Sequence, residues 1–151
     1  MFKRILVPTD GSAPARAATA AAIGLATEMG AEIVAFSVVQ PAPLLFAADN
    51  AMALAGGADL GILEDEARRI VGEVAAAAHA AGVPCRALTA MSLATGDEIV
   101  DAVRRAGCDL VVMGSHGRHG LARLKVGSQT MRVLSTSPVP VLVLPPSAPR
   151  A

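Results

Sequence analysis

The sequence predicts a single α/β domain in which five parallel strands form a doubly wound sheet with helices on both faces. Short β-branched runs alternate with longer stretches of helical period, which is the pattern of repeated strand–helix units. The chain has 151 residues, the size of one domain. Glycines and polar residues follow two of the predicted strands, which indicates a binding site at the carboxyl edge of the sheet.

The first three elements follow from local signals. Residues 3–7 are mostly apolar and predict the first strand. Ser12 and Pro14 are typical of a helix start, and this helix extends to about Gly30. Its predicted inner face comprises Ala18, Ala22, Leu25 and Met29. Residues 32–39 are apolar on both faces, as expected for a central parallel strand.

The second connection is unusually long. Residues 40–59 are rich in Pro, Ala, Gly and Asn without a helical period, which favours a mobile binding flap with local helix. A clear helical stripe then follows, made of Leu60, Leu63, Ala67, Ile70, Val74, Ala77 and Ala81. The opposite face carries charges that are interpreted as solvated and without chemistry, namely Glu64, Asp65, Glu66, Arg68 and Arg69. Gly82 and Pro84 end this helix.

The C-terminal half repeats the alternation. Residues 85–91 predict the third strand, and Thr95 with Glu98 predicts a capping box that opens the third helix. The inner face of that helix comprises Ile99, Val103 and Ala106. Residues 110–113 predict the fourth strand, a helix begins near Gly127-Ser128, and residues 139–144 predict the fifth. The domain is therefore expected to span residues 1–146, with a frayed tail at 147–151.

Composition narrows the range of partners. Thirteen basic and thirteen acidic residues give a net charge of zero. This charge gives no general reason to expect binding to nucleic acid or to an anionic membrane surface. No Asp or Glu follows Asp109, whereas five Lys and Arg residues do, so the C-terminal stretch suits a small polyanion. Without a long apolar stretch or a signal peptide, the expected location is cytoplasmic. Cys85 and Cys108 lie in no metal or redox spacing and are interpreted as small buried hydrophobes.

Two strand ends carry the residues of a candidate site. The first strand ends in Pro8-Thr-Asp-Gly11, and the fourth ends in Met113-Gly-Ser-His-Gly117, which leads through nine residues to Gly127-Ser128. In a doubly wound sheet these two strands are neighbours, so both tips face one crevice. Glycines let backbone N–H groups approach phosphate oxygens, and a helix start adds unpaired donors. Countercharge would come from Arg118, Arg123 and Lys125.

Other interpretations of this loop fit less well. The chain contains no Gly-Lys-Ser/Thr, and the spacing of Gly114, Gly117 and Gly120 differs from the dinucleotide fingerprint. His116 and His119 alone make a weak metal site, so a loop or phosphate-contact role is preferred. Ser115 and Ser128 lack a His–Asp partner order, so no nucleophile is proposed. Asp10 has an alternative interpretation as a structural carboxylate that caps the turn at Gly11.

The sequence resembles the universal stress protein family over nearly its whole length. The resemblance lies in Ile5-Leu-Val-Pro-Thr-Asp-Gly-Ser12, in Asp109-Leu-Val-Val-Met-Gly-Ser-His-Gly-Arg118, and in Gly127-Ser128 leading to Pro138-Val-Pro-Val-Leu-Val143. Its ATP-binding members carry G-x2-G-x9-G-[ST], which Gly114, Gly117, Gly127 and Ser128 fit without insertion or deletion. The resemblance therefore implies the ATP-binding branch and a Rossmann-like fold of the adenine nucleotide alpha hydrolase-like kind.

The resemblance also implies roles for individual residues. Asp10 would bind ribose hydroxyls or Mg²⁺, and Pro8, Thr9 and Val38 would line the adenine and ribose with Met113 beside the base. The nucleotide-binding residues so implied are Pro8, Thr9, Asp10, Val38, Met113, Gly114, Ser115, His116, Gly117, Arg118, Val126, Gly127, Ser128 and Gln129. The family commonly has Val where this chain has Gln129. If position 129 contacts phosphate only through its backbone N–H, the replacement of Val by Gln has no effect. If the Gln129 side chain rotates toward the phosphates, it alters the phosphate preference.

Three functional hypotheses follow. The first is an ATP-binding regulatory or stress-response module that forms a homodimer through its C-terminal edge strand, Val139–Leu144. The second is a slow ATPase or phosphotransferase in which Asp10 and Mg²⁺ position water. The third is a structural dimer that keeps its glycines for turn geometry. The sequence leaves open whether ATP, AMP or cyclic AMP is preferred.

Overall fold

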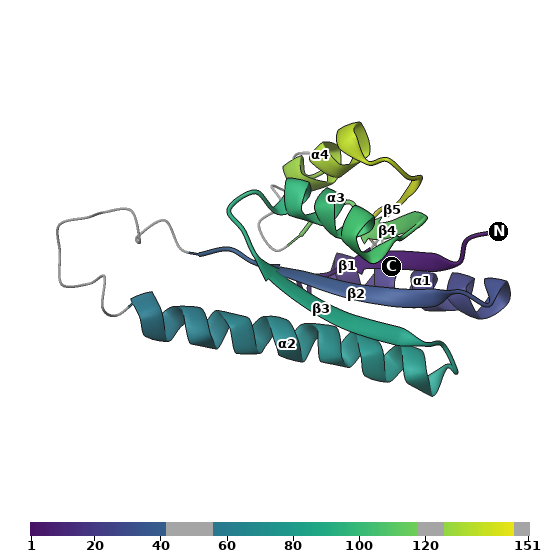
Figure 1. Ribbon diagram of the computed structural model, residues 1–151, viewed down its shortest axis with the longest axis horizontal. Coiled ribbons are helices and arrows are strands. Elements are labelled where there is room, and N and C mark those ends of the chain that lie inside the picture. Colours follow the sequence, from purple (N-terminus) through teal and green to yellow (C-terminus); the bar gives the residue numbers. More distant parts are fainter. Residues whose placement is uncertain (42–55, 118–125, 147–151) are drawn as a thin grey trace, which may run out of the picture.

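The computed structural model describes residues 1–41, 56–117 and 126–146 of the chain. Within them, five strands alternate with four helices (Figure 1). The strands are β1 (Arg4–Pro8), β2 (Glu32–Val39), β3 (Cys85–Met91), β4 (Leu110–Gly114) and β5 (Val141–Leu144). The helices are α1 (Ala13–Met29), α2 (Gly56–Ala80), α3 (Thr95–Ala106) and α4 (Ser128–Thr136).

The sheet is entirely parallel and has the strand order β3-β2-β1-β4-β5. Helices α1 and α2 cover one face, and α3 and α4 cover the other (Figure 1). The predicted doubly wound α/β fold is therefore confirmed. Because the chain leaves β1 toward β2 and later returns on the other side to β4, the carboxyl ends of β1 and β4 flank the point where the winding reverses.

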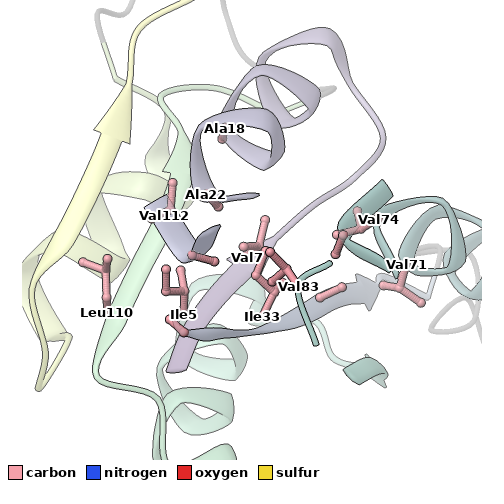
Figure 2. Packing of buried hydrophobic residues seen from close by; sticks show 14 residues of the cluster. Ile5, Val7, Ala18, Ala22, Ile33, Val71, Val74, Val83, Leu110 and Val112 are labelled. Carbon is pink, nitrogen blue, oxygen red and sulfur yellow. The ribbon is translucent and has the colours of Figure 1, made fainter. Parts of the chain in front are cut away.

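Two apolar clusters hold the layers together. On one face Ile5, Val7 and Ile33 of the sheet pack with residues of α1 and α2, in the cluster that Figure 2 shows. On the other face Leu6, Val34 and Phe36 pack against α3 and α4. The small residues of α1, including Ala18 and Ala22, allow this helix to lie close to the sheet (Figure 2). Residues of both clusters come from alternate positions of the same strands, as the two-residue period of a strand requires.

Helix α1 begins and ends as its sequence predicts. The Ser12 hydroxyl accepts a hydrogen bond from the Ala15 N–H, with Pro14 in the first turn. Gly30 closes the helix with a left-handed φ of 64°, a conformation that favours glycine. Ala18 and Ala22 are buried as predicted, and Leu25 and Met29 are half-buried against the same cluster.

Helix α2 differs from its prediction at both its start and its stripe. It begins at Gly56, four residues before Leu60, which is the first apolar residue of the predicted stripe. A helix can begin before its apolar stripe does, so the stripe does not mark the first helical residue. From residue 60 onward its buried residues are Ala67, Ile70, Val71, Val74 and Ala78, whereas Leu63, Ala77 and Ala81 of the predicted stripe are exposed. Of the predicted flap at residues 40–59, residues 42–55 lie outside the described part of the chain.

The predicted capping box at Thr95 is wrong. The residue before α3 is Ala94, which provides no side-chain cap, and Thr95 is already helical. The Thr95 hydroxyl instead accepts a hydrogen bond from the Gln40 Nε2 at 2.7 Å. The acceptor for the N-terminus of α3 comes from another helix, as described below.

The edge strand β5 is shorter than predicted. The ladder begins at Val141, because the Val139 N–H donates to the Ser137 hydroxyl at 3.2 Å and Pro140 has no N–H. Pro140 still contributes its carbonyl, which accepts from the Val111 N–H at 3.0 Å. Strand β1 is shifted by one residue from the predicted 3–7 to Arg4–Pro8, a difference at the usual uncertainty of element ends.

Candidate functional site

A cleft of about 490 Å³ opens at the carboxyl edge of the sheet, above the tips of β1, β2 and β4. It collects most of the residues that the sequence predicted for a nucleotide site. The predicted residues that line it are Pro8, Thr9, Asp10, Val38, Met113, Gly114, His116, Gly117, Gly127, Ser128 and Gln129. Ser115 is buried behind the loop, Val126 is half-buried outside the lining, and Arg118 lies outside the described residues.

The tip of β1 is held by its own polar side chains. The Ser12 N–H donates to Oδ1 of Asp10 at 2.9 Å, and the Gly11 N–H donates to the Thr9 hydroxyl at 3.2 Å. Gly11 turns the chain with a φ of 76°, which a residue with a side chain adopts only with strain. The carboxylate of Asp10 therefore shapes this turn and also lines the cleft, so its structural and binding interpretations are compatible.

The tip of β4 is joined to the start of α4. The Gly127 N–H donates to the Ser115 carbonyl at 2.7 Å, and the Thr130 hydroxyl donates to the Gly114 carbonyl at 3.1 Å. The Ser115 N–H donates to Leu144 in β5 at 2.8 Å. These bonds bring the first and last parts of the loop motif together, although residues 118–125 between them lie outside the described chain.

Close packing leaves little room for a side chain at the three described glycine positions of the motif. A Cβ on Gly114 would lie 3.1 Å from the Pro14 carbonyl group, and one on Gly127 would lie 3.2 Å from the Ser115 carbonyl oxygen. A Cβ on Gly117 would lie 2.7 Å from Oδ2 of Asp10. None of these three glycines has a positive φ, so steric room and not backbone conformation explains the spacing.

The first turn of α4 points backbone donors at the cleft. Gly127 is its N-cap and provides no side-chain hydrogen bond, while Ser128 and Gln129 follow on the cleft wall. The first N–H groups of a helix have no partner within that helix, and the helix dipole places partial positive charge there. Such an arrangement binds phosphate or carboxylate groups.

Gln129 has a side-chain contact that the sequence did not reveal. Its Oε1 accepts a hydrogen bond from the Gly96 N–H at 2.8 Å. This bond supplies the cap that Ala94 does not provide to α3. One side chain on the cleft wall therefore connects the N-termini of two helices.

Helix α2 forms a wall of the cleft that the sequence interpretation missed. Its four lining residues are Leu63, Glu66, Ala67 and Ile70. Glu66 belongs to the charged face that was interpreted as solvated, and its side chain is partly exposed and paired with Arg69. Its position on the wall of the cleft was not predicted. The spacing of these four residues by three and four on one helical stripe was the available signal. Phe36, Ser37, Gln40, Thr95, Ile99, Ala15, Val39 and Thr130 also line the cleft.

The cleft offers little for covalent or multi-ligand metal chemistry. The Ser115 Oγ lies 3.1 Å from the His116 Nδ1, but Ser115 is only 2% exposed and cannot reach a ligand in the cleft. Among the described residues, no three His, Cys, Asp or Glu side chains come together to hold a metal ion. Asp10 alone suits Mg²⁺ only in company with phosphate oxygens, which is a usual way for proteins to bind this ion.

Comparisons with known proteins agree with this architecture. A family model described as the universal stress protein family matches residues 1–145. Universal stress protein MJ0531 of Methanocaldococcus jannaschii is 32% identical over 145 residues, covering 95% of this chain and 82% of that protein. The solved structure of the hypothetical protein MJ0577 has a TM-score of 0.82 and 26% identity, covering 95% and 96% of the two chains. A universal stress protein in complex with cAMP has a TM-score of 0.70 and 23% identity, covering 97% and 99%.

Proposed function

The chain belongs to the universal stress protein family, and from the geometry of its cleft we propose that it binds ATP as a nucleotide-dependent regulatory module. One observation carries the proposal. The N-terminus of α4 and the glycine motif meet Asp10 at one end of a cleft whose other walls are largely apolar. Backbone donors beside an apolar compartment suit a ligand with phosphates at one end and a base at the other.

Each part of the ligand has a matching wall. Pro8, Val38 and Met113 offer apolar contact for adenine, and Asp10 offers a carboxylate acceptor for ribose hydroxyls. Backbone N–H groups at Gly117, Ser128 and Gln129 would serve the phosphates. The Gly127 N–H already donates to the Ser115 carbonyl, so Gly127 contributes by letting the chain approach closely. Ser115 supports the loop from beneath, and His116 lines the cleft beside Gly117.

Mg²⁺ would accompany ATP in this proposal. In the alternative in which Asp10 binds Mg²⁺ in place of the ribose hydroxyls, its carboxylate would hold the ion together with phosphate oxygens, since Mg²⁺ is often bound through one or two carboxylates plus substrate phosphates. Its charge would offset the repulsion between the Asp10 carboxylate and the phosphates. Arg118, Arg123 and Lys125 would add countercharge, and all three lie outside the described residues.

The ligand class rests on this cleft and not on the solved relatives. The protein solved with cAMP is 23% identical to this chain, which supports a common fold alone. Cyclic AMP and AMP share the adenosine portion with ATP but carry one phosphate. The phosphate end of the cleft is therefore the part that distinguishes these ligands.

Titration calorimetry with ATP and MgCl₂ tests the proposal. We expect saturable binding to the wild-type chain and loss of that binding on Gly117→Val, which places a branched side chain against Asp10. ATP is also expected to raise the melting temperature of the wild type, because a ligand that binds only the folded state stabilises it. Absence of heat and of any melting shift at millimolar ATP would refute nucleotide binding.

Turnover is expected to be slow at most. The buried Ser115 supplies no accessible nucleophile, and ATP hydrolysis would depend on water positioned by Asp10 and Mg²⁺. Incubation with ATP and MgCl₂, followed by measurement of ADP, distinguishes a binding module from an ATPase. An Asp10→Ala variant serves as the control for hydrolysis at this cleft.

We also propose that two copies associate through β5. This strand lies at the edge of the sheet, and 42% of Leu142 is exposed there. An edge strand presents unpaired backbone groups to a second copy. A dimer in light scattering at micromolar protein supports this arrangement, and a strict monomer refutes it.

None of the described helices has the length and apolarity to cross a membrane. A cytoplasmic location is part of this proposal.

A further inference from the structure

Gln129 has a side chain whose orientation is fixed by a neighbouring helix. It is the second residue of α4, and its Oε1 accepts from the backbone N–H of Gly96, the second residue of α3, at 2.8 Å. A backbone N–H can bond only to the oxygen of a side-chain amide. The contact therefore assigns Oε1 to α3 and turns the Nε2 amino group away from it.

The two helices have a second connection that does not involve Gln129. Nε of Arg132 donates to Oδ1 of Asp97 at 2.7 Å. Gly96 also packs so closely on Arg132 that a Cβ at Gly96 would lie 2.8 Å from the Arg132 side chain. Because this pair also holds α3 against α4, the Gln129 amide is not the only link between the helices.

The two N–H donors on Nε2 of Gln129 are available to a ligand only if they face the cleft. Gln129 lines it beside Gly127 and Ser128, where α4 presents its first backbone N–H groups. A neutral amide adds two N–H donors to that end without adding charge. Its Oε1 stays occupied by Gly96, so rotation of the amide to present an acceptor would break an existing bond.

We propose that Gln129 is a specificity-determining residue, which donates from Nε2 to the phosphate chain of the ligand while its Oε1 remains bound to Gly96. The residue thereby favours phosphorylated adenine ligands over adenosine. This inference rests on the proposed nucleotide-binding function and adds to it a side chain that reads the phosphate end.

The test compares ATP and adenosine as probes of wild-type protein and Gln129→Met, in calorimetry at fixed MgCl₂. Methionine has a similar length, favours helix and carries no donor. We expect affinity for ATP to fall about tenfold, near the lower end of what a hydrogen bond to a charged group contributes. Affinity for adenosine is expected to stay within about twofold, because adenosine carries no phosphate for Nε2 to contact.

Two further variants keep the result interpretable. Gln129→Glu retains an acceptor for Gly96 but no donor, and we expect it to weaken ATP binding at least as much as Gln129→Met. The double variant Asp97→Asn/Arg132→Gln removes the other link between α3 and α4 without changing net charge, and both ligands are expected to bind it as they bind the wild type.

Several outcomes would overturn the inference. An unchanged ATP affinity in Gln129→Met excludes the phosphate contact. An equal loss for adenosine, or a similar loss of ATP affinity in the double variant, shows that Gln129 acts only by connecting helices. A wild-type chain that binds adenosine as tightly as ATP also contradicts it while leaving adenine binding intact. Failure of the wild type to bind either probe instead refutes the proposed function itself.

Discussion

A Cβ added to Gly117 would lie 2.7 Å from Oδ2 of Asp10, so the loop after β4 lies directly against the tip of β1. The carboxylate has little freedom to retreat, because its Oδ1 accepts from the Ser12 N–H at 2.9 Å. The two chain segments that the sequence singled out therefore lie against each other at this point. Any residue larger than glycine at position 117 must displace either the carboxylate or the loop.

Gly117→Ala is expected to weaken ATP binding while leaving the fold intact. The added methyl group displaces Asp10 or the adjacent N–H groups from the cleft, and a change of this kind lowers affinity by roughly tenfold if about one charged hydrogen bond is lost. Gly117 is exposed, and the hydrogen bond from the Ser12 N–H to Asp10 is the described structural contact that a shift of the carboxylate would weaken, so the free energy of unfolding should fall by no more than about 1 kcal/mol. Calorimetry with ATP and urea unfolding without it measure the two effects.

Gly72→Ala is the matched control for that substitution. Gly72 is an exposed residue within α2, and a Cβ there meets no atom within 4 Å. Alanine in a helix interior is favoured over glycine by about 1 kcal/mol, so the melting temperature should rise while ATP affinity stays constant. Equal ATP affinity in Gly117→Ala and Gly72→Ala would contradict the role given to the contact with Asp10.

Gly114→Ala should destabilise the fold itself. A Cβ at this buried end of β4 would lie 3.1 Å from the backbone of Pro14, in the first turn of α1. Backbone cannot swing aside as a side chain can, and overpacking of this kind costs about 1–3 kcal/mol. Urea unfolding measures the loss against Gly24→Ala, where a Cβ in α1 meets nothing within 4 Å. A Gly114→Ala variant as stable as the wild type would show that α1 moves to accommodate the methyl group.

The fold and most of the cleft could be predicted because both depend on short-range patterns. Strand β2 is apolar on both faces, and its bounds agree with the prediction. The glycine motif fixed the place of the site, since a parallel sheet gathers the ends of its strands at one edge. Asp10 and Gly117 were both identified in this way, although the distance between them was not.

The missed features are contacts between elements distant in the sequence. Gln129 caps α3 across 33 positions of the chain, and no local pattern at Thr95 indicates that its predicted capping box is replaced. Glu66 was assigned to a solvated face together with its neighbours, and its position on the cleft wall beside Leu63 and Ile70 was not predicted. Periodicity gives the face of a helix but not the element that it meets.

Cys108 is expected to be unreactive in the folded chain. Its side chain is buried, and this burial raises the pKa of the thiol to about 11, although the charges of Arg4 and Arg86 act in the opposite direction. The thiolate is the nucleophile, so at pH 8 its population falls about 100-fold relative to an unperturbed cysteine. In a Cys85→Ala background, a thiol reagent should modify Cys108 at least that much more slowly before unfolding than after it. Comparable rates in the two states would show that Cys108 is open to solvent.

Asp109 is expected to make stability depend on pH in the acid range. Burial acts to raise the pKa of its carboxyl, but hydrogen bonds from the backbone N–H groups of Arg4, Lys3 and Asp109, with the charge of the N-terminus, outweigh it and lower the pKa. The folded pKa therefore lies below the unfolded value of about 3.9, so the carboxylate stabilises the fold above that pH. The contribution is lost as pH falls through the folded pKa.

Asp109→Asn tests this dependence, because asparagine keeps one acceptor oxygen for Lys3 or Arg4 but no charge. We expect a loss of about 1 kcal/mol in the free energy of unfolding at pH 7, which is below the usual contribution of a hydrogen bond to a charged group because solvent screens this partly exposed site. The difference between wild type and variant should stay constant from pH 7 to pH 5 and shrink below pH 4. A difference that is the same at pH 3 and pH 7 would mean that the carboxylate acts by shape and not by its charge.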